Sequence, residues 1–226
     1  MNIHLDQKLS YITNCFIAAI APLMAWLLAV YFNDADPYFM SISGYYILTP
    51  SREVFMTLTF SNVYSHFPLL RTLSHESVVS KRISYLEYLV FISVAAISLA
   101  PAHEYRIHGL LGVICFTSAS AFMLTHYLFR HDKRSTDLVV VVLAAICFIA
   151  MPVYFPWAVN WQIMELITHN ANPKTIISML DNHSAWRSFA MFEWTFYYAF
   201  LFYYFRLYKR FEPNDNTCSI YEHMTV

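Results

Sequence analysis

The sequence predicts an all-α membrane protein, a six-transmembrane helix bundle with both termini in the cytosol. Of the 226 residues, 58% are hydrophobic and only 13% are charged, against roughly 25% charged residues in an average soluble domain. Such a chain lacks the polar surface that a water-exposed globule needs, so its composition indicates lipid as the solvent. Only 3 glycines are present, which excludes a glycine-rich phosphate loop or dinucleotide fingerprint. The net charge of -1 gives no reason to expect nucleic acid as a partner.

Six apolar stretches are each long enough to cross a bilayer, which takes ~20 mostly apolar residues. Backbone groups in lipid must pair within their own segment, so we expect these stretches to be helices. The stretches 11–32 and 138–159 contain no charged residue, and the ionisable residues of 108–129 are histidines. The stretches 53–70, 85–102 and 187–208 are weaker, because they hold Glu53, Glu87 and Glu193 respectively. The predicted organisation is a six-span domain over residues 1–210 and a cytosolic polar tail over residues 211–226.

The distribution of Lys and Arg predicts the orientation, because cytosolic loops carry an excess of both. With both ends of the chain in the cytosol, 10 of the 14 Lys and Arg fall on the cytosolic side. The non-cytosolic loops are then 33–52, 102–107 and 160–186. The last of these contains the glycosylation sequon Asn182-His183-Ser184. It lies only a few residues before the last span, so we expect it to be used poorly.

Ionisable side chains inside a membrane are costly, at roughly 2.5–3.5 kcal/mol each on insertion scales, so each is a functional candidate. Glu193 is the most informative, because it lies about six residues into the last predicted span. A carboxylate there must be paired, protonated or in contact with a wet cavity. For Glu87 and His126, near the cytosolic face, snorkelling or a bond across helices is the favoured interpretation. The residues do not decide between the structural and the functional role for His66.

Arg52 follows Pro50 and opens the second span directly before Glu53. One interpretation is a local ion pair at a helix start, where the helix dipole favours the glutamate. The other is a cation at the level of the lipid headgroups that holds a phosphate through two hydrogen bonds. The sequence leaves both interpretations open.

No metal site or cofactor is predicted. In the string from His103 to His108 the two histidines are five residues apart, whereas the zinc-protease motif needs them four apart on one helix face. Aromatic residues crowd the ends of the last two spans, and we interpret them as interfacial anchors. They are Trp157, Trp161, Trp186, Tyr203, Tyr204 and Tyr208.

Several short stretches, in order over nearly the whole chain, resemble one membrane-protein family. The family is that of post-GPI attachment to proteins factor 2, within the wider family that contains the damage-regulated autophagy modulators. The stretches are Pro37-Tyr38-Phe39-Met40-Ser41-Ile42-Ser43, Pro50-Ser51-Arg52 followed by Val54-Phe55, Glu87, Glu104-Tyr105-Arg106-Ile107-His108, Pro152-Val153-Tyr154-Phe155 and Phe192-Glu193-Trp194.

The resemblance implies a six-span protein of the Golgi or endoplasmic reticulum membrane that is required for fatty-acid remodelling of GPI anchors. The step in question returns a saturated fatty acid to the lyso-GPI intermediate, which supports stable surface expression of GPI-anchored proteins. The implied partners are membrane lipid, GPI-anchored proteins and other GPI-remodelling proteins. Whether the chain is the acyltransferase or an accessory factor is left open by the sequence.

If the chain is catalytic, we expect His108 to act as the general base, with Glu104 or Glu193 orienting it. Arg52 and Tyr154 are the candidate substrate-binding residues. The alternative is a non-enzymatic membrane factor, such as an autophagy modulator or a lipid-binding scaffold. A small transporter ranks below both, because the chain shows neither repeat symmetry nor glycine-rich broken helices.

Overall fold

The structure is a computed structural model that describes residues 3–33, 42, 50–73, 78–100, 105–129, 134–158 and 184–207. These residues form six helices and, over the same ranges, no strand, which confirms the all-helical prediction for this part of the chain. The helices are α1 (Ile3–Asn33), α2 (Ser51–Leu73), α3 (Val78–Leu99), α4 (Tyr105–Phe129), α5 (Ser135–Ala158) and α8 (Ser184–Phe205). Among the described residues, three segments are long and apolar enough to cross a membrane: Lys8–Phe32, Ile107–Phe129 and Ser135–Tyr154.

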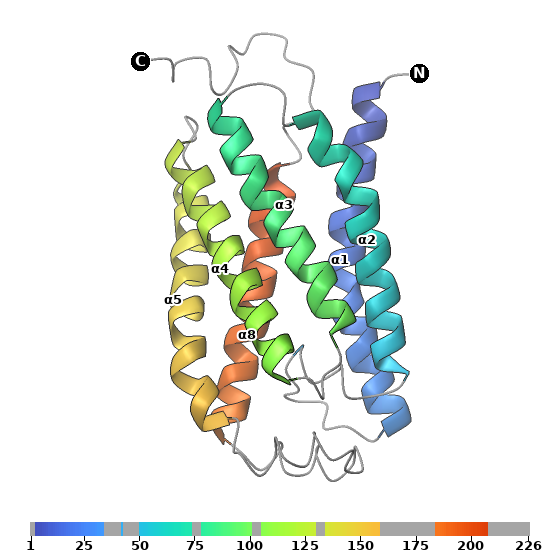
Figure 1. Ribbon diagram of the computed structural model, residues 1–226, viewed down its shortest axis with the longest axis vertical. Helices are drawn as coiled ribbons and strands as arrows, with labels where there is room; N and C mark the ends of the chain where they lie inside the picture. The colour runs from blue at the N-terminus through green and yellow to red at the C-terminus, as the bar shows by residue number, and fades with distance from the viewer. Residues whose placement is uncertain are drawn as a thin grey trace.

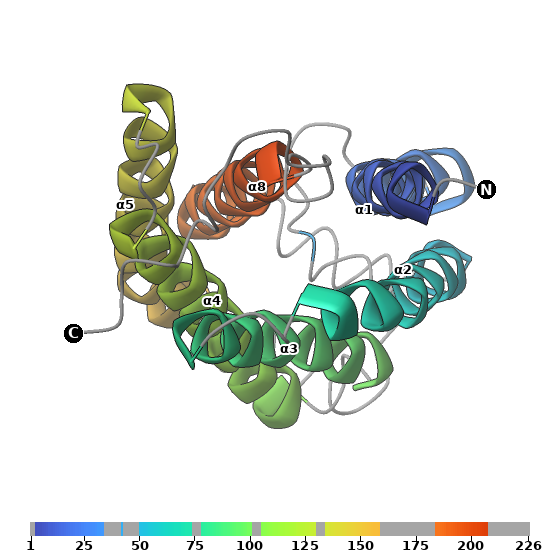
Figure 2. The same ribbon diagram turned by 90° about the horizontal axis from the view of Figure 1, so that it is seen from above.

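The helices run alternately up and down and form a ring in the order α1, α2, α3, α4, α5, α8 (Figures 1 and 2). Helix α8 closes this ring by packing between α5 and α1. Helix α1 begins, and α8 ends, at the same end of the bundle, which is called the terminal end below. Helices α2, α4 and α8 all begin at the opposite end, called the distal end.

The helices are longer or shifted relative to the apolar stretches. Helix α1 begins at Ile3 rather than at residue 11, and α3 begins at Val78 rather than at residue 85, because helical hydrogen bonding continues through polar residues outside the apolar run. Helix α3 ends at Leu99, two residues before Pro101, since a proline disfavours helical geometry in the residue before it. The predicted tail over 211–226 and the sequon at Asn182 lie outside the described residues.

Two apolar clusters fill the bundle. The larger one takes buried side chains from all six helices, including Val63, Phe122 and Phe200. The smaller one forms around Ala21, Ala25 and Ala29 of α1, whose spacing of four residues puts them on one helix face. Small side chains on this face let α1 approach its neighbours closely.

Tyrosines of α8 join it to α1 at a break in the hydrogen bonding of α1. Pro22 lies inside α1 and has no backbone N–H, so the carbonyl of Ala18, four residues earlier, loses its helical donor. The hydroxyl of Tyr197 donates to this carbonyl at 2.7 Å, and the hydroxyl of Tyr198 donates to Ala19 at 3.1 Å. A neighbouring helix thus supplies the hydrogen bond that the proline removes.

We expect Tyr197→Phe to lower the free energy of unfolding in detergent by about 1–3 kcal/mol, because it leaves the Ala18 carbonyl without a donor. In a Pro22→Ala background the same change becomes nearly neutral, since the new N–H of residue 22 can pair with Ala18. Tyr198→Phe is the matched control and has the smaller effect, because Leu23 retains the N–H that ordinarily serves Ala19. Equal losses from Tyr197→Phe in both backgrounds would contradict this account.

Candidate functional site

Three of the predicted site residues lie on helices that begin at the distal end. Arg52 is the second residue of α2 and is half-buried. His108 lies in the first turn of α4, and Glu193 is buried in the third turn of α8. The helix directions therefore bring these three residues to the same half of the bundle, as the sequence predicts from their non-cytosolic positions.

Glu193 lies farther from the start of its helix than the sequence predicts. It follows Ser184, the first residue of α8, by nine residues, which is about 14 Å along the helix rather than the predicted 9 Å. At this depth it lies within electrostatic range of Cys115 of α4, whose thiol is hydrogen-bonded to Ser93 of α3. His108 precedes Cys115 by seven residues, or about 10 Å along α4. The surroundings of Glu193 thus lie about two helical turns along α4 from His108.

Of the remaining two predicted residues, the structure describes Tyr154. Glu104 lies outside the described residues. Tyr154, near the end of α5, is 36% exposed, and its ring stacks on Phe192 of α8 with centroids 5.5 Å apart. The tyrosine is thus fixed beside the residue that precedes Glu193, with part of its side chain open to the outside of the bundle.

The stretches that carry the family resemblance meet at the smaller apolar cluster. Ile42, Phe55 and Trp194 belong to three such stretches that are far apart in the sequence, and all three side chains pack in this cluster. Ser51, in the same stretch as Phe55, is fully buried, and its hydroxyl has no hydrogen-bond partner among the described residues. The distal end therefore combines a shared apolar support with polar groups at the starts of α2 and α4.

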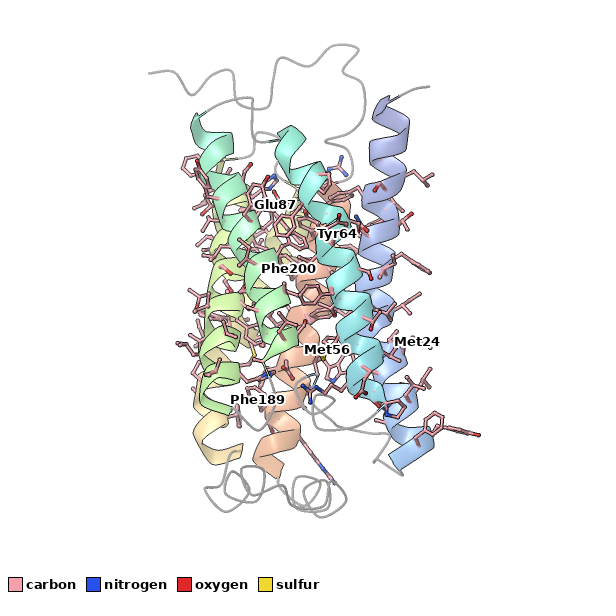
Figure 3. All side chains as sticks on the ribbon, turned by 45° about the vertical axis from the view of Figure 1, so that its right-hand side comes forward. Met24, Met56, Tyr64, Glu87, Phe189 and Phe200 are labelled. Atoms are coloured by element: carbon pink, nitrogen blue, oxygen red, sulfur yellow. The ribbon has the colours of Figure 1, made fainter. Side chains whose placement is uncertain are left out.

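A second group of polar side chains is buried toward the terminal end, where Figure 3 shows Glu87, while Phe189 lies toward the distal end. We call it the terminal-end network; it consists of Tyr11, His66, Glu87, His126, Tyr203 and Tyr204. The hydroxyl of Tyr204 donates to Oε1 of Glu87 and also bonds Nε2 of His66. The hydroxyl of Tyr11 donates to the backbone carbonyl of Tyr204. One residue of α8 thereby links α1, α2 and α3.

The direction in which the Tyr204 hydroxyl donates determines whether Nε2 of His66 is a donor or an acceptor. A hydroxyl has one hydrogen to donate, and Tyr204 gives it to the Glu87 carboxylate. Nε2 of His66 must then carry the proton that it donates to the oxygen of Tyr204. The bonded chain from imidazole through hydroxyl to carboxylate has no exposed member.

Aromatic rings pack tightly around this chain. His66 stacks on Phe91 with centroids 4.4 Å apart, and Tyr204 stacks on Phe200 at 5.6 Å. The neighbouring Tyr203 points to another side of α8, where its hydroxyl lies 2.9 Å from Nδ1 of His126 on α4. Successive helical residues differ in direction by about 100°, so two adjacent tyrosines reach both sides of the interior.

The network corrects one interpretation and confirms another. Tyr203 and Tyr204 are 1% and 2% exposed, so the interpretation of these two residues as interfacial anchors was wrong. Glu87 and His126 do bond across helices, as the favoured interpretation for them states. Tyr11 was not singled out, since a tyrosine at the start of an apolar run carries no signal of its partner.

Neither polar group has the composition of a metal centre. Within the described ranges, no group of three or more His, Cys, Asp or Glu side chains is placed to hold a metal ion. The terminal-end network is rich in tyrosine hydroxyls instead, and these are suited to sharing protons and bridging helices. Arg52 and His108, which are half-buried, lie at the distal end instead.

We expect Tyr204→Phe to lower the free energy of unfolding by about 1–3 kcal/mol, because it leaves buried polar groups of Glu87 and His66 without this partner. Tyr64→Phe is the matched control: Tyr64 is 80% exposed, so its hydroxyl should contribute little. Thermal unfolding of both variants in detergent measures the difference. Equal stability of the two variants would show that the network does not hold the bundle together.

Comparison with known proteins adds no relative on which to base a function. No protein-family model, no curated protein and no solved structure matches this chain. The functional argument therefore depends on the residues and on where the structure places them.

Proposed function

We propose that this chain is a six-span membrane protein required for fatty-acid remodelling of GPI anchors, at the step that reacylates the lyso-GPI intermediate. Both termini face the cytosol, and the protein resides in the Golgi or endoplasmic reticulum membrane. The distal end then faces the leaflet in which the GPI lipid is anchored. The observation that carries the proposal is the meeting of Ile42, Phe55 and Trp194, from three stretches that resemble the family, in one apolar cluster at that end.

The polar residues of the distal end fit an acyl-transfer site. Arg52, at the start of α2, is placed to hold a lipid phosphate, for which the planar guanidinium is well suited. His108 accepts the proton of the free lyso-GPI hydroxyl, and the oxygen attacks the carbonyl carbon of an activated acyl donor. The bond from this carbon to the leaving group breaks, and the leaving group takes up the proton. Glu104 orients the imidazole, while Glu193 lies deeper, beside Cys115.

The proposed topology predicts that tags at both ends of the chain are exposed to the cytosol. Tags placed before residue 1 and after residue 226 should both bind antibody in cells whose plasma membrane alone has been permeabilised. The reason is the excess of Lys and Arg on that side. A tag inserted between residues 160 and 183 is the control and should stay protected until internal membranes are opened. Tags on opposite faces would contradict the six-span proposal.

The proposed chemistry predicts that His108→Ala abolishes rescue of surface GPI-anchored proteins in cells that lack the remodelling factor. The variant protein should remain as abundant as the wild type, because His108 lies in the first turn of α4 and belongs to neither apolar cluster. Gly109→Ala is the matched control on the same turn, since a methyl group there meets nothing within 4 Å. Cytometry of a GPI-anchored surface marker gives the measurement.

Full rescue by His108→Ala would remove this residue from the mechanism. A second measurement separates the enzyme from an accessory factor, namely acyl transfer to lyso-GPI by the purified protein. Activity of the wild type and its loss in His108→Ala support catalysis by the chain itself. Rescue in cells without activity in vitro supports the accessory role.

A further inference from the structure

An apolar groove runs along the outside of the bundle between α5 and α8, which lie side by side in the ring (Figure 2). Its volume is about 430 Å³, which suits one lipid chain rather than a whole lipid. The floor and walls are almost entirely apolar. They are formed by Val140, Leu143, Trp194, Thr195, Tyr198, Ala199 and Phe202.

A cation lies at the end of this groove that faces the terminal end. The guanidinium of Arg206 is 5.9 Å above the ring of Phe202, which lines the groove. Nη1 of Arg206 contacts Oδ1 of Asp137 at 2.8 Å and the hydroxyl of Thr136. Both contacts use the same nitrogen, and a guanidinium also carries N–H groups on Nη2 and Nε. The Arg206 side chain is 19% exposed against 2% for Asp137, so the cation forms the outer member of the pair.

The surroundings of Arg206 carry more positive than negative charge. Arg134 is exposed just before α5, where its carbonyl accepts a hydrogen bond from the N–H of Asp137. The side chain of Asp137 thus pairs with Arg206, while Arg134 adjoins it along the backbone and adds a second positive charge at the start of α5. In the sequence, four further basic residues adjoin these positions, at 130, 133, 209 and 210, against two acidic residues, at 132 and 212. Such a basic cluster beside a membrane helix attracts anionic headgroups.

The groove also matches a lipid chain in length. Trp194 and Arg206 are twelve residues apart on α8, which is about 18 Å along the helix. Half of a hydrocarbon core of ~30 Å is ~15 Å. A chain that starts beside Arg206 therefore reaches Trp194 near the middle of the bilayer.

We propose that this groove binds an acyl chain of an anionic phospholipid, whose phosphate is held by Arg206 and Arg134. The lipid belongs to the leaflet at the terminal end, opposite to the leaflet of the GPI anchor. The site depends on α5 and α8 crossing the membrane and is independent of GPI remodelling. An anionic headgroup is favoured over a zwitterionic one because only it leaves a net negative charge for the two arginines to offset.

Tryptophan fluorescence tests the site, because Trp194 lines the groove. The full-length protein is placed in phosphatidylcholine vesicles that contain either phosphatidylserine or phosphatidylcholine with brominated acyl chains, which quench nearby tryptophans. Subtracting the signal of Trp194→Phe isolates the contribution of this residue. We expect brominated phosphatidylserine to quench it at several-fold lower mole fraction than brominated phosphatidylcholine.

Charge variants then locate the headgroup. Arg134→Gln and Arg206→Gln should each weaken the phosphatidylserine preference about fivefold, since a basic residue near the surface contributes about 1 kcal/mol. Arg206→Lys should keep most of the preference, which separates loss of charge from loss of folding. Arg187→Gln is the matched control, because this exposed arginine lies at the distal end of the same helix.

Two outcomes would overturn the proposal. Equal quenching of Trp194 by the two brominated lipids would show that the groove has no preference for an anionic lipid. No quenching by either, together with crosslinking between copies at residue 143, would show that a second copy of the chain covers the groove. Neither outcome bears on reacylation of lyso-GPI, which the cell-based rescue measures separately.

Discussion

The bundle depends on hydrogen bonds that polar groups of one helix receive from another helix. Its interior is apolar and aromatic, so a buried carbonyl, carboxylate or imidazole must find its partner within the protein. Helix α8 supplies most of these partners through tyrosine hydroxyls. Tyr197 serves the carbonyl that Pro22 leaves open, and Tyr204 bonds both His66 and Glu87. The ring is therefore closed by the last helix in the sequence, through contacts that span more than a hundred residues.

Tyrosine suits this task because its ring and its hydroxyl act in different ways. The ring fills apolar space, as Tyr204 does against Phe200, and the hydroxyl lies far enough from the backbone to reach across the interior. A serine hydroxyl is shorter and can bond a carbonyl of its own helix, as Ser118 does with Cys115. The aromatic content of the last helix thus has a structural cause in addition to any contact with lipid.

Over the described residues, the sequence predicts the helical structure well, because an uninterrupted apolar run of ~20 residues has few other structures open to it. It places the helix starts less well. Helices α1 and α3 continue for about two turns into polar residues, where hydropathy carries no signal.

The sequence does not predict which side chains form hydrogen bonds with the buried ionisable residues. Glu87, His66 and His126 stand out as ionisable residues in apolar runs, yet nothing in their spacing identifies Tyr204 or Tyr203. Those contacts depend on how α8 rotates against α2, α3 and α4, which is set by packing of the whole ring. Glu193 illustrates the same limit, since its depth follows from a helix start three residues earlier than expected.

The terminal-end network and the polar residues of the distal end differ in exposure, and this difference indicates different roles. Every ionisable member of the terminal-end network is 4% exposed or less, and each has a bonded partner. Substrate has no route to such groups without opening the packed rings around His66, so their role is to hold helices together. Arg52 and His108 instead lie at helix starts and are half-buried, with both ring nitrogens of His108 covered by the protein. We place the proposed acyl transfer at the distal end, where these two residues lie, while the terminal-end network holds α8, the helix that carries Glu193 and Trp194, against α1, α2, α3 and α4.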